Sequence, residues 1–222
     1  MIAVPTPLSD DKKPVLDYVF AATRSIAPML KRGDLVILES TSPVGTTEAM
    51  AGILAEARPD LVFPAHGKTG EADIAIAYCP ERVLPGRILK ELVDNDRCVG
   101  GLTPACAAKA RRFYELFVRG ECIETAARTA EMVKLTENAF RDTNIAFANE
   151  LSMLCGKLHI NVWELIALAN RHPRVDILKP GPGVGGHCIA VDPWFIVDAA
   201  PDESPLIRTA RTVNDGKVGH VI

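Results

Sequence analysis

The stretch "DLVILESTSPVGTTEAMAGILAEAR", residues 34–58, decides the fold class. It opens with a continuous apolar run, which is typical of a strand buried on both faces. A turn rich in serine and threonine follows, and then a helical pattern in which Thr46 or Thr47 can serve as the N-cap. A strand that leads directly into a helix is the repeating unit of a doubly wound α/β sheet.

The same alternation extends over roughly the first 125 residues. The helix predicted near the end of this region has Thr103 as its cap and Pro104 in its first turn. Together these patterns predict a doubly wound parallel sheet in residues 1–125. Further strands are predicted at 2–7, 73–81, 96–101 and 121–125, and helices at 15–33 and 103–120.

The pattern changes after residue 125. Residues 129–159 contain no glycine or proline before Gly156, which predicts one helix of about 30 residues. A second helix is predicted at 161–172, followed by a segment rich in proline and glycine. We therefore expect a mainly helical region after residue 125, and the last residues of the chain, "GHVI", suggest the beginning of a strand.

Composition excludes several function classes. The net charge of −3 gives no sign of nucleic-acid binding. No apolar run reaches the roughly 18 residues that a membrane span needs, and the N-terminus lacks the features of a signal peptide. The six cysteines form no C-x-x-C pair, which favours free thiols in a reducing cytoplasm and gives little support to a metal site.

The glycine-rich stretch "PGPGVGGHCIAVDPW", residues 180–194, allows two interpretations. A dinucleotide loop needs a strand before it and a helix after it, and neither fits here, because "LKP" before Gly181 is a poor strand and Pro193 leaves no room for a helix. Alternatively, the glycines let backbone and ligand approach Cys188 closely. Cys188 can equally be a small buried residue beside a tight loop, and the residues alone leave these two possibilities evenly balanced.

Polar residues at two further places are candidates for a site. Lys134, Asn138 and Arg141 share one face of the long predicted helix, where they form either a solvated stripe or the lining of a polar cavity. Other hydroxyl and charged side chains follow predicted strands, at the edge where doubly wound sheets bind ligands. These are Ser40, Thr41, Ser42, Glu81 and Arg82.

Six stretches together resemble the UDP-glucose/GDP-mannose dehydrogenase family. They are "VPTP", "ESTSPVGTT", "YCPERVLPG", "TAEMVKLTENAFRD", "NRHPRV" and "GPGVGGHCIAVDP", and they run in family order. Their details are most similar to members that oxidise UDP-N-acetyl-D-mannosamine. Pro85 stands where UDP-glucose members have a second acid, and UDP-N-acetylglucosamine 6-dehydrogenases are the nearest alternative.

The resemblance implies an NAD-dependent, four-electron oxidation of a sugar C6 alcohol to a carboxylate, in the synthesis of surface polysaccharide precursors. Cys188 would be the nucleophile that holds the aldehyde as a thiohemiacetal and then as a thioester. Lys134 would exchange a proton with the C6 oxygen or stabilise its charge. Asn138 and Asp192 would hold water and oxygens, and Glu81 would position or activate the hydrolytic water.

The resemblance also implies binding residues and a homodimer. Thr6 and Thr41 match threonines that touch NAD. In this family the arginine of the "HPR" segment can reach a neighbouring subunit's site. The residues that would bind the UDP-sugar are Arg82, Val83, Lys134, Asn138, Arg141, His172, Arg174 and Gly185.

Relative to the family, the chain resembles an internal piece. The glycine-rich turn and the first strands of the Rossmann-like sheet are missing, so residues 1–125 would be the C-terminal part of the NAD-binding domain. The resemblance implies a central helical domain at 126–205 and only the start of the third, UDP-binding domain at 206–222. We therefore expect little or no dehydrogenase activity from the chain alone. A non-catalytic dimerising fragment stays open, and so does an unrelated cysteine enzyme using His187, although adjacent residues rarely point the same way.

Overall fold

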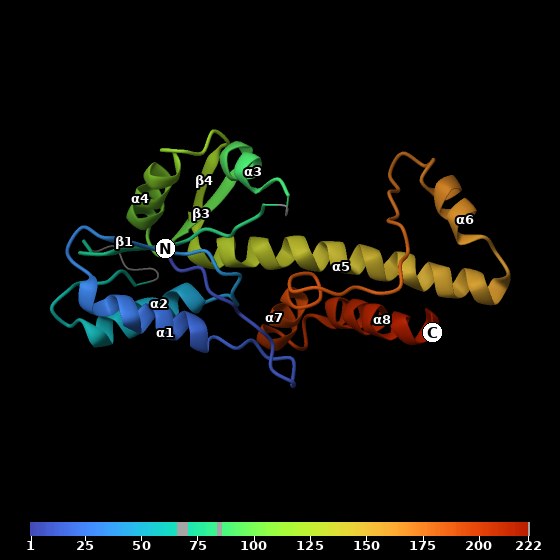
Figure 1. The fold of residues 1–222 in the computed structure, drawn as a ribbon, viewed down its shortest axis with the longest axis horizontal. Coiled ribbons are helices and arrows are strands. Elements are labelled where there is room, and N and C mark those ends of the chain that lie inside the picture. The colour runs from blue at the N-terminus through green and yellow to red at the C-terminus, as the bar shows by residue number, and fades with distance from the viewer. Residues whose placement is uncertain (66–70, 84–85, 222) are drawn as a thin grey trace. The chain divides into compact units, whose positions relative to one another are not determined.

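The computed structural model describes residues 1–65, 71–83 and 86–221, and it divides into two compact units. The first unit comprises Met1–Ser9 and Pro14–Lys134, and the second comprises Asp10–Lys13 and Leu135–Ile222. Figure 1 traces the chain through both.

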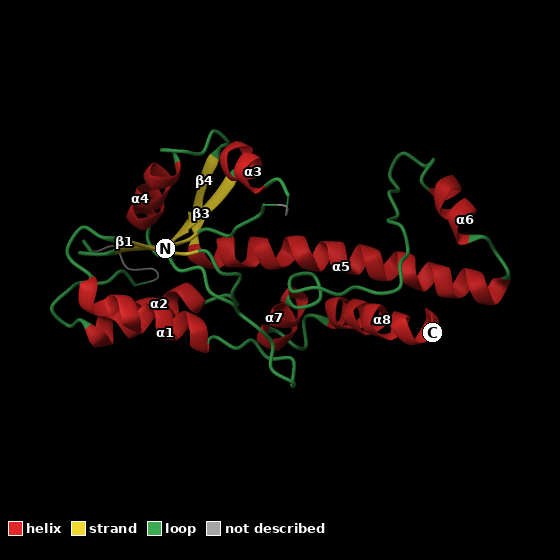
Figure 2. Cartoon of the chain, viewed as in Figure 1, coloured by secondary structure: helices red, strands yellow, loops and turns green. Residues whose placement is uncertain are grey.

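The described residues of the first unit form a four-stranded sheet in the order β1-β2-β3-β4, drawn as yellow arrows in Figure 2. The β1–β2 and β3–β4 pairs are parallel, whereas β2 and β3 are antiparallel. The expectation of a doubly wound α/β sheet is confirmed, with one pair reversed. The strands are β1 (Leu35–Leu38), β2 (Ala75–Tyr78), β3 (Arg97–Gly101) and β4 (Cys122–Ala126).

The N-terminal segment adds only an isolated bridge to this sheet. Ile2 pairs in parallel with Leu38, and its backbone bonds to Ile37 and Glu39 at 2.8 and 2.9 Å. The strand predicted at 2–7 is therefore reduced to one residue that continues the sheet beyond β1.

Helices in the first unit follow the predicted positions with shifted ends. Thr103 caps α4 as predicted, accepting the Cys106 N–H at 3.3 Å. The N-cap of α2 is Gly45, with φ of 97°, so Thr46 and Thr47 lie inside the helix. The short α3 was not predicted. The bounds are α1 (Asp17–Ile26), a 3-10 turn (Ala27–Met29), α2 (Thr46–Ala57), α3 (Ile88–Asp94) and α4 (Pro104–Tyr114).

Strand β1 shows how the sheet is covered on both faces. Val36 and Leu38 belong to one buried cluster, which includes Met50 and Leu54 of α2. Ile37 points the other way and belongs to a second cluster, which includes Tyr114 of α4. Because apolar side chains alternate between two packed layers, the continuous apolar run is explained.

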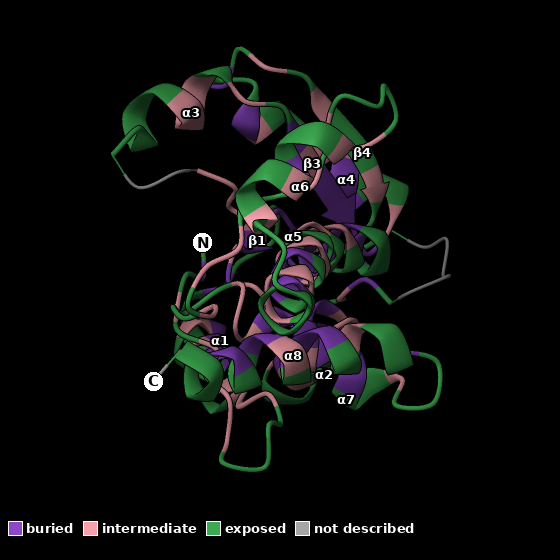
Figure 3. Cartoon of the chain, turned by 90° about the vertical axis from the view of Figure 1, so that its right-hand side faces the viewer, coloured by how far each residue is buried: buried purple, intermediate pink, exposed green. Residues whose placement is uncertain are grey.

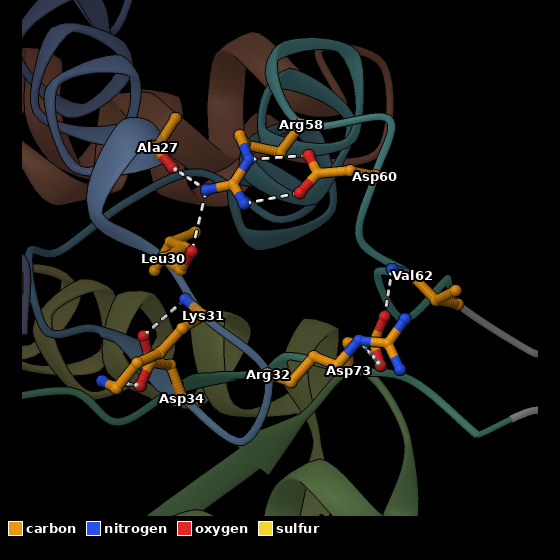
Figure 4. A network of polar contacts seen from close by, with 9 residues as sticks. All are labelled: Ala27, Leu30, Lys31, Arg32, Asp34, Arg58, Asp60, Val62 and Asp73. Carbon is orange, nitrogen blue, oxygen red and sulfur yellow. Dashed lines mark hydrogen bonds and ion pairs between the residues drawn. The ribbon is translucent and has the colours of Figure 1, made fainter.

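A set of polar contacts fixes the connections that enter β1 and β2 (Figure 4). The Arg58 guanidinium donates to the carbonyls of Ala27 and Leu30 at 3.0 and 2.8 Å, and it forms an ion pair with Asp60. Asp34, just before β1, pairs with Lys31 at 2.8 Å. These contacts lie at the amino ends of the parallel strands, where we assign them a structural role.

Helix α5 (Ala127–Leu158) has 32 residues, which confirms the long predicted helix. It begins in the first unit and continues into the second. The predicted helix after it is shorter, as α6 (Val162–Ala169), with Asn161 as its cap.

Two helices of the second unit differ from expectation. The prediction that Pro193 leaves no room for a helix is wrong, because α7 (Asp192–Ala199) contains Pro193 in its first turn, where proline is tolerated. The strand suggested by "GHVI" is wrong, since α8 (Pro205–Val221) extends through these residues to Val221. No helix in the described part of the chain combines the length and apolar character of a membrane span.

Candidate active site

Two of the predicted cofactor residues meet at the carboxyl end of β1. The Thr6 hydroxyl donates to the Thr41 carbonyl at 2.6 Å, and the Val4 N–H donates to the Ser40 hydroxyl at 2.7 Å. The segment after Ile2 is thus tied to the turn after β1. This is the edge at which doubly wound sheets bind nucleotides.

The N-terminus of α2 is occupied by a carboxylate of the protein itself. Glu131 of α5 accepts the Gly45 N–H at 2.6 Å, and it accepts the Thr47 N–H and hydroxyl at 2.9 and 2.6 Å. Burial raises the pKa of Glu131, although these hydrogen bonds oppose the rise. Glu131 therefore caps α2, a role that its position in the sequence did not reveal.

Glu81 fixes the turn that follows β2. One carboxylate oxygen accepts the N–H groups of Arg82 and Val83 at 2.7 and 3.0 Å. The other forms an ion pair with Arg97 at 3.2 Å. The Arg82 side chain donates to the Asp96 carbonyl. Both oxygens of Glu81 thus orient this turn, and Arg97, which sequence reasoning missed, is buried beside it.

Pro85, whose position in the motif bears on the choice of sugar, lies outside the described residues. Leu84 lies outside them as well, whereas Arg82 and Val83 of the same motif are described and half-buried.

In the second unit, two candidate residues form a buried pair. The Asn138 amide of α5 donates to the Asp192 carboxylate at 2.5 Å, and both residues are at most 5% exposed. Asp192 is the first residue of α7, and its N–H donates to the Cys188 carbonyl at 2.9 Å. The structure therefore brings Asn138 and Asp192 together beside the turn that begins at Cys188.

Cys188 differs from the other cysteines in its exposure. All six are free thiols, and Cys188 alone among them is exposed, whereas the others are buried or half-buried. Gly183 and Gly186 precede it with φ of 142° and 91°, conformations that favour glycine. The interpretation of Cys188 as a buried small residue is wrong, since the glycines leave its thiol accessible.

Iodoacetamide is expected to alkylate Cys188 far faster than Cys79 at about pH 8, because only the thiolate reacts. Burial raises the pKa of Cys79 to about 11, so its thiol stays protonated below that pH, and it is fully shielded. Peptide mass spectrometry over a labelling time course measures both rates. Equal rates at the two cysteines would contradict this prediction.

The remaining candidates lie at several places. Lys134 is half-buried on α5, four residues before Asn138, and Arg141 is exposed on the same helix. His172 and Arg174 are exposed in the segment that follows α6. They are joined locally, since the Arg174 N–H donates to His172 at 3.4 Å. Gly185 is exposed in the loop before Cys188.

Comparisons with protein families match most of the chain. Residues 1–118 match the NAD binding domain of the UDP-glucose/GDP-mannose dehydrogenase family, and residues 128–216 match its central domain.

Individual relatives match the whole chain. An NDP-N-acetyl-D-galactosaminuronic acid dehydrogenase of Ralstonia nicotianae is 68% identical over 222 residues, which are 100% of this chain and 52% of that protein. A UDP-N-acetyl-D-mannosamine dehydrogenase of Escherichia coli is 66% identical, over 100% of this chain and 53% of that protein. The chain thus spans about half the length of the curated relatives it matches.

Solved structures of related dehydrogenases also match nearly the whole chain and about half of their own length. A UDP-D-ManNAc dehydrogenase from Pyrococcus horikoshii has a TM-score of 0.87 and 48% identity, covering 97% of this chain and 50% of that one. A UDP-N-acetyl-mannosamine dehydrogenase from Staphylococcus aureus has a TM-score of 0.83 and 50% identity, covering 99% and 51%.

Proposed function

The chain belongs to the UDP-glucose/GDP-mannose dehydrogenase family, and on that premise we propose that it serves the NAD-dependent oxidation of UDP-N-acetyl-D-mannosamine to the corresponding uronate. Its first unit is an NAD-binding domain of this family. The observation that carries the proposal is the buried Asn138–Asp192 pair beside the exposed Cys188. Such a pair, next to an accessible thiol, suits covalent catalysis on a polar substrate.

The carboxyl end of β1 fits the cofactor. Thr6 and Thr41, joined by a hydrogen bond there, would hold NAD, which accepts a hydride in each of the two oxidations when bound. Glu131 already occupies the N-terminus of α2, so that helix end is closed to the cofactor's phosphates.

Cys188 is proposed to form the covalent intermediate. Its thiolate adds to the C6 aldehyde left by the first oxidation, and the oxygen takes up a proton to give a thiohemiacetal. Loss of a second hydride and of that proton leaves a thioester. Water then cleaves the carbon–sulfur bond, which releases the carboxylate and restores the thiol.

The other residues support these steps. Asn138 and Asp192 would orient the C6 oxygen and the attacking water, and Lys134 would exchange a proton with that oxygen. Glu81 would either hold the Arg82–Val83 turn against the substrate or position and activate the hydrolytic water. Further contacts to the UDP-sugar would come from Arg141, His172, Arg174 and Gly185. The guanidinium groups of the two arginines suit diphosphate oxygens.

A chimera tests this function, because this chain matches only half of its relatives. The chain would replace the matching segment of the E. coli relative, and NADH would be followed with UDP-N-acetyl-D-mannosamine. We expect two NADH per sugar. UDP-N-acetylglucosamine and an N-acetylgalactosamine nucleotide serve as competing substrates, the latter because the Ralstonia relative is 68% identical. No sugar-dependent NADH in a folded chimera would contradict the proposal.

A homodimer through the second unit is part of the proposal. Phe140, Phe147 and Leu154 are 68%, 54% and 48% exposed and follow one another at intervals of seven residues on α5. Side chains at that spacing lie on one helix face, and Trp163 and Leu168 of α6 add further exposed apolar surface. A patch of this kind suits an isologous interface.

Phe147→Asp is expected to weaken the dimer roughly 100-fold, because it places a charge in an apolar contact. Leu89→Asp is the matched control, since Leu89 is 83% exposed on α3, outside this stripe. Sedimentation velocity across a concentration series measures both variants. A monomeric wild-type chain, or equal association in the two variants, would contradict the proposed interface.

A further inference from the structure

The second unit contains a buried polar network between α5 and α8, formed by Asp142, Asn149, Arg211 and Asn214. None of the four is more than 1% exposed. The Arg211 guanidinium donates to the Asp142 carboxylate at 2.6 Å, and the Asn214 amide donates to the same oxygen at 2.8 Å. Figure 3 marks the buried stretches of α8 in purple.

This network ends at the backbone of the glycine loop, defined as residues 180–188. The Asn149 amide donates to the Asn214 side-chain oxygen at 2.9 Å, and the Asn149 oxygen accepts the Gly181 N–H at 2.8 Å. Each end of the Asn149 side chain therefore has its own partner, so the amide has one favoured orientation. A chain of hydrogen bonds runs from Asp142 through α8 to the loop.

Gly183 brings the loop close to α8 as well. A Cβ at this position would lie 3.0 Å from the Val218 side chain and 3.3 Å from the Asn214 carbonyl. Its φ of 142° also favours glycine. The loop therefore lies directly against α8 at Gly183.

The far end of the loop is linked through Asp192 to α5, the helix that carries Asn149. Cys188 is bonded through its carbonyl to Asp192, which pairs with Asn138. Asn138 and Asn149 are eleven residues apart on α5, about three turns, so they lie on nearly the same face. One face of α5 therefore holds both ends of the loop.

Stability alone is a weak reason for such a network. Buried ion pairs are often no better than well-packed apolar residues. Among the described residues, one Asp142 oxygen and the Arg211 Nε have no hydrogen-bond partner. Burial also raises the pKa of Asp142 even though Arg211 opposes the rise. The network instead fixes the orientation of the Asn149 side chain, so that its amide oxygen accepts the Gly181 N–H.

We propose that Asn149 and Asn214 are positioning residues for the loop that presents Cys188, and that α8 is thereby part of the cysteine site. The inference rests on the proposed function in that Cys188 is taken as the reacting residue. Loss of the Asn149 oxygen would free the Gly181 end of the loop, while Asp192 would still hold the other end.

A nitroxide label on Cys188, the exposed cysteine, reports the order of the loop without any need for activity. Asn149→Ala is expected to raise the ratio of mobile to immobile label roughly fivefold, the effect of losing one neutral hydrogen bond. Ser152→Ala is the matched control, because Ser152 joins the same two helices through Lys217 at 2.7 Å without touching the loop. Its spectrum should equal that of the wild type.

A second pair of variants tests the same contact from the loop side. Gly181→Pro removes the N–H donor. Gly181→Ala keeps the N–H, and its added methyl group would meet no other atom within 4 Å. We expect increased label mobility in the proline variant only. If Asn149→Ala does not fold, the comparison of these two Gly181 variants tests the contact in its place. Equal spectra for Gly181→Pro and Gly181→Ala, or for folded Asn149→Ala and Ser152→Ala, would overturn the proposal. An inactive chimera would contradict the proposed function and leave these readouts unaffected.

Discussion

Replacing Cys188 with alanine in the chimera is expected to lower sugar-dependent NADH formation by roughly 10³-fold or more, because no thiohemiacetal can form for the second oxidation. Cys188 is exposed and is bonded to Asp192 through its backbone carbonyl, so the change removes the proposed nucleophile and leaves the Asn138–Asp192 pair in place. Steady-state and single-turnover NADH formation measure the effect. The aldehyde, or the unreacted alcohol, should be the only sugar recovered.

Cys122→Ala is the control for this result. Cys122 is a free, half-buried thiol on the edge strand β4, and its removal should leave the rate close to that of the wild type. A Cys188→Ala chimera that still yields two NADH per sugar at a comparable rate would show that another group forms the intermediate.

Arg211→Ala is expected to lower the free energy of unfolding by about 3–5 kcal/mol, because it leaves the buried Asp142 carboxylate without its cationic partner. Arg211 and Asp142 are each 1% exposed at their side chains and are joined at 2.6 Å. Urea unfolding followed by circular dichroism measures the change. The double variant Asp142→Leu/Arg211→Met should be far less destabilised, since it buries no unpaired charge.

The pH dependence of Arg211→Ala follows from the same pair. Burial already raises the pKa of Asp142 in the folded chain, and Arg211 limits that rise. A carboxyl group whose pKa is raised by folding stabilises the fold below its unfolded pKa, and this contribution is lost as pH rises through the folded pKa. The defect of Arg211→Ala should therefore shrink on acidification from neutral pH. A defect that is constant with pH would contradict this account.

The strand and helix pattern of the first unit could be predicted because its apolar periodicity is strong. The side chains of residues 35–38 alternate between two buried clusters. The helix of 32 residues could be predicted because it contains no glycine or proline before Gly156. The antiparallel placement of β3 could not be predicted, since the direction of a strand depends on the path of the chain between β2 and β3.

The errors at the end of the chain have a different cause. The buried face of α8 is polar, with Arg211, Asn214 and Lys217, so apolar periodicity could not identify it. A proline also argues against a helix in most positions, but Pro193 lies in the first turn of α7, where it costs no helical hydrogen bond.

Some residues of the candidate site could be predicted from motifs, and others could not. Residues matched by motif, such as Asn138 and Asp192, do lie together. The partners of Glu81 and of the α2 N-terminus, Arg97 and Glu131, were missed because they come from distant parts of the sequence. A single sequence carries no signal for such contacts.

The most direct test of the central claim is to identify the covalent intermediate. The chimera would be quenched with acid during turnover of UDP-N-acetyl-D-mannosamine and digested, and the peptide that contains Cys188 would be analysed by mass spectrometry. We predict that this peptide, and no other, gains the mass of the acyl-linked sugar nucleotide, and that hydroxylamine removes it. Turnover with Cys188 unmodified at every quench time, or the same mass on another residue, would contradict the account.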